Sequence, residues 1–190
     1  MLQVYTGNGK GKTTAAVGLA IRALGAGMRV YMMQFMKSLA YSEQKILQDF
    51  YPRLVLETSG KPFFIAKEGM LTEEEREAWG DDVVIFPKGN PPREYVDCLT
   101  AGFSAARQKI LSGQFSLAVL DELNVALFFG LIERQKVERL LSDIPDSVEL
   151  VITGRGAPDW LLKRADLVTD MREIKHYYSK GIEARAGIEN

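Results

Sequence analysis

Short apolar runs alternate along the chain with segments in which apolar residues recur every three or four positions. The apolar runs predict strands at 2–6, 28–35, 53–57, 118–120, 148–153 and 167–171. The three-to-four spacing predicts helices at 12–26, 96–110 and 137–144. Apolar strands separated by helices are typical of a mostly parallel sheet covered on both faces. We therefore expect a single α/β domain over 1–190, with about six strands and with ligands at their carboxyl ends.

The segment 58–93 interrupts this alternation, because it carries eight glycine and proline residues. Within it only 72–79 reads as a helix, with Thr72 as N-cap and Glu75 at the capping-box position. A stretch of this length in a compact domain is typical of a functional loop, so we expect a lid or a substrate loop. A disordered insertion is the alternative.

The composition is that of a folded domain, with 46% hydrophobic and 26% charged residues. The formal net charge of −1 gives no overall attraction for nucleic acid. Cys98 is the only cysteine, so an intrachain disulfide is excluded and a reducing cytoplasm is the expected compartment. The apolar runs are shorter than the roughly 18 residues of a membrane span, and the amino terminus reads as a strand rather than a signal peptide.

A glycine- and lysine-rich turn between the first strand and the first helix is the strongest chemical signal. Its residues are Thr6, Gly7, Asn8, Gly9, Lys10, Gly11, Lys12, Thr13 and Thr14. In this strand–turn–helix context the pattern indicates a P-loop, whose backbone N–H groups surround phosphate oxygens. Lys12 would hold the terminal phosphates and the Thr13 hydroxyl would bind Mg²⁺. The pattern is incomplete, because Thr6 stands where the first glycine belongs, and a turn without a ligand is the alternative.

Two later strand ends supply partners for such a loop. Asp121 and Glu122 follow the apolar run 117–120, where one or both carboxylates would reach Mg²⁺; an N-cap role for Asp121 is the alternative. Arg155 stands between Gly154 and Gly156 after the strand 148–153, where it could approach phosphates bidentately, unless it is an incidental charge on a turn. His176 is the only histidine, which excludes a multi-histidine metal site and favours a structural role.

Four stretches together resemble the P-loop-type ATP:corrinoid adenosyltransferases. They are 6–14, 119–124, 153–156 and a C-terminal run formed by 165–172 with Lys175, His176 and 181–189. The resemblance spans nearly the whole chain and is weakest at 60–93. It implies a P-loop NTPase-like, RecA-like fold and an enzyme in which cobalt(I) of a corrinoid attacks the 5′-carbon of ATP and triphosphate leaves.

The resemblance also implies roles for the residues. The loop residues Gly7 to Thr14 would bind ATP, in reverse orientation along the loop and with Asn8 near the ribose. Lys12 and Arg155 would stabilise the departing triphosphate, and Thr13, Asp121 and Glu122 would serve Mg²⁺.

Bulky side chains of the central segment would bind the corrinoid and exclude its lower axial ligand. Phe63 and Phe64 are the candidates, ahead of Trp79, and ordinary packing is the alternative for both phenylalanines. A reduced flavin or flavoprotein would supply the electron, and a homodimer is expected. Because Met1 leads directly into the first strand, the corrinoid cover is expected from the central segment, the tail or another subunit. The competing functions are a P-loop kinase or ATPase acting at the γ-phosphate and a non-catalytic, nucleotide-dependent corrinoid carrier.

Overall fold

A six-stranded parallel sheet forms the centre of the protein. The computed structural model describes residues 1–38, 40–182 and 184–189. The sheet order is β3-β2-β6-β7-β1-β8, and every neighbouring pair is parallel. The strands are β1 (Leu2–Thr6), β2 (Val30–Phe35), β3 (Leu54–Ser59), β6 (Leu117–Asp121), β7 (Glu149–Thr153) and β8 (Leu167–Asp170). The α/β prediction is confirmed, and each of these strands ends within two residues of its expected bounds.

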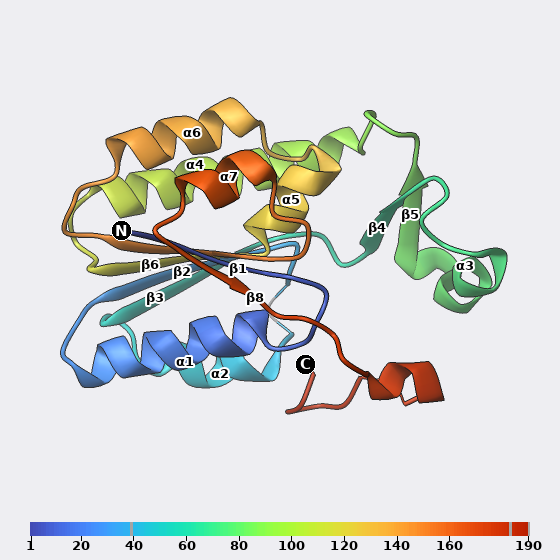
Figure 1. The fold of residues 1–190 in the computed structure, drawn as a ribbon, viewed down its shortest axis with the longest axis horizontal. Helices are drawn as coiled ribbons and strands as arrows, with labels where there is room; N and C mark the ends of the chain where they lie inside the picture. Colours follow the sequence, from blue (N-terminus) through green and yellow to red (C-terminus); the bar gives the residue numbers. More distant parts are fainter. Residues whose placement is uncertain (39, 183, 190) are drawn as a thin grey trace.

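Helices cover both faces of the sheet (Figure 1). One face carries α1 (Lys12–Gly25) and α2 (Ser42–Gln48). The other carries α4 (Arg93–Leu111), α5 (Leu123–Phe129), α6 (Arg134–Asp143) and α7 (Asp159–Arg164). The sequence pattern did not predict α2, α5 and α7, because helices of 7, 7 and 6 residues are too short to display a periodic face.

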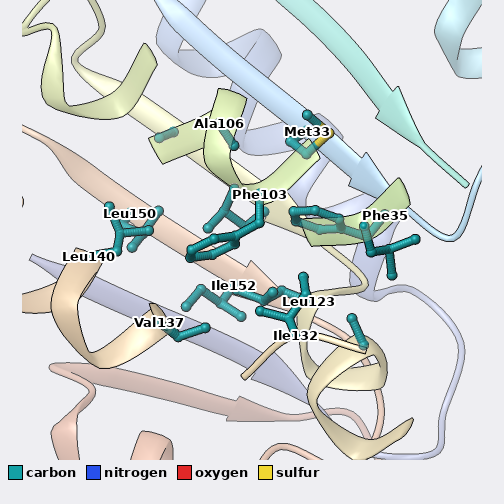
Figure 2. Packing of buried hydrophobic residues seen from close by; sticks show 14 of the residues in the cluster. Met33, Phe35, Phe103, Ala106, Leu123, Ile132, Val137, Leu140, Leu150 and Ile152 are labelled. Carbon is teal, nitrogen blue, oxygen red and sulfur yellow. The ribbon is translucent and has the colours of Figure 1, made fainter. Parts of the chain in front are cut away.

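The two faces are packed differently. The alanines Ala16, Ala20 and Ala23 of α1 are buried, and these small side chains let the helix lie close to the sheet. The other face is filled mostly by larger side chains, and Figure 2 shows Phe103 of α4 among them. The buried face of α4 was expected to begin at Val96, but the structure places the neighbouring Tyr95 in the core and leaves Val96 partly exposed.

Residues 60–92, which we call the insert, form a small parallel unit of their own. The strands β4 (Phe64–Lys67) and β5 (Val83–Phe86) pair, and the helix α3 (Glu73–Trp79) and a 3₁₀ turn (Gly80–Asp82) connect them. The unit extends beyond the carboxyl ends of the main strands (Figure 1). The capping box of Thr72 and Glu75 is present as predicted. The two strands were not predicted, because each has only four residues between turn-forming residues.

The sheet was expected to be covered on both faces, but the edge strand β8 is exposed. All four of its residues are exposed, including Leu167 and Val168. Among the helices that the structure describes, none has both the length and the apolar character needed to cross a membrane.

Candidate functional site

The loop between β1 and α1 is held against the chain that follows β8. Gly9 N donates to Met171 O at 2.7 Å, and Met171 N donates to Thr6 O at 2.9 Å. A Cβ on Gly9 would lie 2.7 Å from Met171 O, and one on Gly7 would collide with Asp170. Glycine is therefore required here by the close approach of two backbones. The C-terminal run that resembles the family thus lies beside the loop.

Lys12 is folded back onto the loop that precedes it. Its side chain is buried, and Nζ donates to Gly7 O at 2.7 Å and to Gly9 O at 2.6 Å. Burial lowers the pKa of Lys12, and the nearby charge of Arg155 lowers it further. The ammonium group thus occupies the centre of the loop, where it can exchange two carbonyl acceptors for the oxygens of an anion.

Asp121 joins three strand ends to the start of α1. The residue has no exposed surface. Its carboxylate accepts hydrogen bonds from Thr13 Oγ1 at 2.9 Å, Thr153 Oγ1 at 2.6 Å and Gln34 Nε2 at 3.2 Å. It also accepts one from Lys37 Nζ at 2.9 Å. Asp121 belongs to β6 and caps no helix, so the structure gives no support to the N-cap alternative.

Glu122 adopts a left-handed backbone, with φ of 61°, directly after β6. Its N–H donates to Thr153 Oγ1 at 3.0 Å. Burial, together with the neighbouring charge of Asp121, raises the pKa of Glu122 to about 7. Its carboxyl lies against Gly154, where a Cβ would stand 3.2 Å from Glu122 Oε2 and 3.0 Å from Asn124 Cβ. Gly154, with φ of 126°, therefore lets the ends of β6 and β7 approach each other closely.

These oxygen donors are suited to a hard cation. Because the Thr13 hydroxyl donates its hydrogen to Asp121, its lone pairs remain available to a metal. Within the described residues no group of three or more acidic, histidine or cysteine side chains could hold a metal ion. A magnesium ion would therefore depend on phosphate oxygens and water in addition to the protein, which is how Mg²⁺ is usually bound beside nucleotides.

Three adjoining cavities open over these strand ends. The loop cavity, of about 340 Å³, is lined by residues that include Lys12, Thr13, Glu122, Arg155 and Glu189. The central cavity, of about 520 Å³, is lined by residues that include Thr13, Lys37, Tyr41, Glu122 and Glu189. The aromatic cavity, of about 440 Å³, is lined by residues that include Lys37, Tyr41, Phe63, Phe64 and Glu189. Because neighbouring cavities share lining residues, they form a continuous series from the loop to the insert.

The cavities separate the predicted loop residues into two groups. Gly9, Lys10, Gly11 and Thr14 line the loop cavity together with Lys12 and Thr13. Gly7 and Asn8 instead line a separate hollow beside Asp170. Arg155 is exposed in the loop cavity and makes no hydrogen bond or salt bridge with the residues that the structure describes.

The two candidate phenylalanines have different surroundings. Phe63 is half-buried, and its ring lies edge-on to Tyr95 of the core at 5.5 Å between centroids. Phe64 is 52% exposed and lies edge-on to Trp79 at 4.6 Å. Phe63 therefore anchors the insert, whereas Phe64 and Trp79 form an aromatic pair on its surface.

The C-terminal tail also contacts the loop, through the carboxylate of Glu189. Lys10 Nζ lies 3.0 Å from Glu189 Oε1, and Tyr177 and Arg185 also bind the Glu189 carboxylate. His176 Nδ1 accepts a hydrogen bond from Tyr178 N at 3.1 Å, which caps a 3₁₀ turn at Tyr177–Lys180. This contact fits the structural role expected for the histidine, although its side chain also borders the loop cavity.

Sequence reasoning missed two polar residues of the site, Gln34 and Lys37, and gave Glu189 no role of its own. Gln34 is a fully buried amide in an otherwise apolar strand, and Lys37 follows the end of that strand by two residues. Both positions are signals that could have been used, because ligands of parallel sheets gather at the carboxyl ends of strands. Glu189 lies in the C-terminal run that resembles the family, but its contact with Lys10 could not be predicted because it joins distant parts of the chain.

Comparison of the sequence with known proteins shows which family the chain belongs to. A corrinoid adenosyltransferase of Pseudomonas aeruginosa is 35% identical over 100% of this chain and 83% of its own length. The corrinoid adenosyltransferase CobA of Salmonella typhimurium is 31% identical, and a corrinoid adenosyltransferase of Escherichia coli is 29% identical, each over 98% of this chain and 83% of its own length. Residues 1–190 match one family along their whole length. The chain belongs to the ATP:corrinoid adenosyltransferase BtuR/CobO/CobP family.

Proposed function

We propose that this protein transfers the 5′-deoxyadenosyl group of ATP to the cobalt of a corrinoid and releases triphosphate. Family membership and the relatives' names support the activity. The observation that carries the assignment to this site is the continuity of the three cavities. A lysine-bearing phosphate loop lies at one end of the series and an aromatic surface lies at the other.

The reaction requires no proton transfer. The cobalt(I) electron pair forms a bond to the 5′-carbon, the bond from that carbon to its oxygen breaks, and the triphosphate leaves with the electrons of that bond. The protein's task is therefore to stabilise negative charge on the departing oxygen. Lys12, Arg155 and the loop N–H groups are suited to this task, because both cations border the loop cavity. Lys12 would exchange the Gly7 and Gly9 carbonyls for phosphate oxygens.

The loop residues Gly7, Asn8, Gly9, Lys10, Gly11 and Thr14 complete the proposed ATP site. Magnesium would be held by Thr13 and by Asp121 or Glu122, and it would neutralise part of the phosphate charge. The hydrogen bond from Thr13 to Asp121 supports this placement, since it orients the hydroxyl before any metal arrives.

The insert would cover the corrinoid. Phe64 is the better placed of the two candidates, because its exposed ring borders the aromatic cavity while Phe63 is committed to Tyr95. Trp79, which packs on Phe64, would support that ring. An apolar cover that keeps water and the lower axial ligand from cobalt would make cobalt(I) easier to reach from cobalt(II).

The electron donor, the compartment and the assembly are further parts of the proposal. We propose a reduced flavin or flavoprotein as electron donor, the cytoplasm as compartment and a homodimer as the assembly. The exposed Leu167 and Val168 on the edge strand β8 are consistent with a protein contact there.

One anaerobic incubation with ATP, Mg²⁺ and chemically reduced cobalamin tests the proposal. We expect a light-sensitive cobalt–carbon species in the visible spectrum, together with inorganic triphosphate. ADP without that species would indicate a kinase or ATPase instead. Stoichiometric corrinoid binding without turnover would indicate a carrier.

A further inference from the structure

Lys37 is a largely buried cation that contacts β6, α2 and the residue before α2. Its side chain is 11% exposed, and Nζ lies 2.9 Å from Asp121 Oδ2 of β6 and 3.6 Å from Glu43 Oε1 of α2. The same ammonium lies 4.8 Å from the centre of the Tyr41 ring. Lys37 therefore holds a carboxylate of the sheet and an aromatic ring that precedes α2 in fixed relation to each other.

The backbone that delivers Lys37 is strained. Met36, the residue before it, has φ of 58°, in the left-handed region that residues other than glycine rarely adopt. The turn is fixed by a hydrogen bond from Met36 N to Ser59 O at 2.7 Å. A strained residue costs about 1–3 kcal/mol, and such residues concentrate at functional positions. Here the left-handed conformation of Met36 turns the chain, so that Lys37 enters the site directly after β2.

Lys37 and Tyr41 lie at the boundary between two of the cavities, which Glu189 also lines. Both residues line the central cavity, which also contains Thr13 and Glu122. Both also line the aromatic cavity, which contains Phe63 and Phe64. In the site of the proposed function, the first cavity takes the nucleotide and the second takes the corrinoid. The carbon that moves from one substrate to the other would therefore cross the boundary that these residues line.

The charge on Lys37 is maintained by its neighbours. Burial alone would lower the pKa of this lysine, but the charges of Asp121, Glu43 and Glu122 and the hydrogen bond to Asp121 raise it overall. Because its charge is already paired with Asp121, Lys37 is better suited to fixing geometry than to attracting an anion.

We propose that Lys37 is a positioning residue that couples the two substrate sites, so that ATP bound beside Asp121 favours a corrinoid bound beside Tyr41, and the reverse. The inference rests on the proposed function for the identity of the two ligands. The contacts are arranged as such coupling requires, because Lys37 touches both Asp121, which holds the Thr13 hydroxyl of the central cavity, and Tyr41, whose ring borders the aromatic cavity. Coupling of this kind is reciprocal and amounts to about 5- to 150-fold in affinity.

The test measures affinity for one substrate with and without the other. Calorimetry gives the dissociation constant of ATP·Mg²⁺ in the absence and presence of saturating cob(II)alamin, with no reductant, so that no transfer occurs. In the unmodified protein, cob(II)alamin should tighten ATP binding about fivefold or more. Lys37→Met should reduce this ratio to within about twofold of unity, whatever its effect on ATP alone. Lys37→Arg, which keeps the charge and the ring contact, should retain more than half of the coupling free energy.

Lys61→Met is the matched control. Lys61 lines the aromatic cavity from the insert, but its ion pair is with Glu94 at 3.4 Å rather than with Asp121. This variant should keep the coupling. Tyr41→Leu removes the ring while leaving the ion pair with Asp121, and it decides the matter if Lys37→Met does not fold. Tyr41→Leu should also reduce the coupling.

Three results would overturn the inference: no coupling in the unmodified protein, unchanged coupling in Lys37→Met and Tyr41→Leu, or equal loss in Lys61→Met. Failure of the proposed function is a different result, because the unmodified protein would then form no adenosylated corrinoid from ATP and pre-reduced cobalamin, whatever the binding measurements give.

Discussion

Replacing Lys12 with methionine should remove most of the catalytic rate without unfolding the protein. The ammonium makes two short hydrogen bonds, at 2.6 and 2.7 Å, in a loop that encloses it. Hydrogen bonds of a charged group contribute about 1.5–3 kcal/mol each. In the reaction these hydrogen bonds would be made to the departing triphosphate. Losing them in Lys12→Met should resemble the removal of a preorganised donor, which lowers kcat about 100- to 1,000-fold.

The stability change should be small, because two effects oppose each other. Methionine leaves the carbonyls of Gly7 and Gly9 without this donor, which is unfavourable. It also removes a buried charge whose pKa is lowered by burial and by Arg155, which is favourable. We expect a net change within about 1 kcal/mol, or roughly 2–4 °C in Tm for a domain of this size.

The assay is the initial rate of adenosylcobalamin formation from pre-reduced cobalamin, followed in the visible spectrum, alongside thermal unfolding of each variant. Lys10→Met is the control from the same loop, since Lys10 is exposed and directed to Glu189. It should lose less than about tenfold in rate. A near-normal rate in Lys12→Met, or an equal loss in Lys10→Met, would refute the role assigned to Lys12.

Four further variants test other parts of the account. In the unmodified protein, the raised pKa of Glu122 makes the folded state less stable as pH rises from 4.5 to about 7, by about 3 kcal/mol. Glu122→Gln should remove this loss, so that its free energy of unfolding changes less with pH. Urea unfolding at a series of pH values measures this change, and an unaltered pH dependence would contradict the prediction. Phe64→Ala should slow the reaction that starts from cobalt(II) more than the reaction given cobalt(I), whereas Phe63→Ala should instead lower stability by about 2 kcal/mol; equal losses of Phe64→Ala in both assays would indicate general packing. Lys67 of the insert places Nζ 3.9 Å from the centre of the Phe128 ring, which helps to hold the insert against α5. Lys67→Met removes this cation–π contact, worth roughly 1 kcal/mol, and should raise the KM for corrinoid about fivefold while leaving the KM for ATP unchanged. A parallel rise in both KM values would contradict a role in holding the insert.

The sequence was most informative where the chemistry is local. A strand, a glycine-rich turn and a helix are contiguous at 2–25, so the loop could be predicted from its own residues. The acidic pair Asp121 and Glu122 was found for the same reason, because it follows directly on a buried strand. The parallel sheet followed from uniformly apolar strands, since burial on both faces leaves no alternation to read.

The parts that were missed depend on contacts between distant segments or on very short elements. The position of Lys37 depends on a left-handed residue at Met36 and on a carboxylate 84 positions away. The ion pair of Lys10 with Glu189 joins the two ends of the chain. In the insert, β4 and β5 each have four residues, and only their pairing with each other makes them strands. Such features arise from tertiary packing, which no local pattern records.

A crystal structure with ATP and Mg²⁺ bound would test the central claim most directly, that the loop from Gly7 to Thr14 holds a triphosphate about to leave carbon. We predict three phosphates in the loop cavity, with Lys12 Nζ moved from the carbonyls of Gly7 and Gly9 onto phosphate oxygens and Arg155 turned towards them. A nucleotide bound elsewhere, or a loop in which Lys12 keeps both carbonyls at saturating ATP, would contradict it.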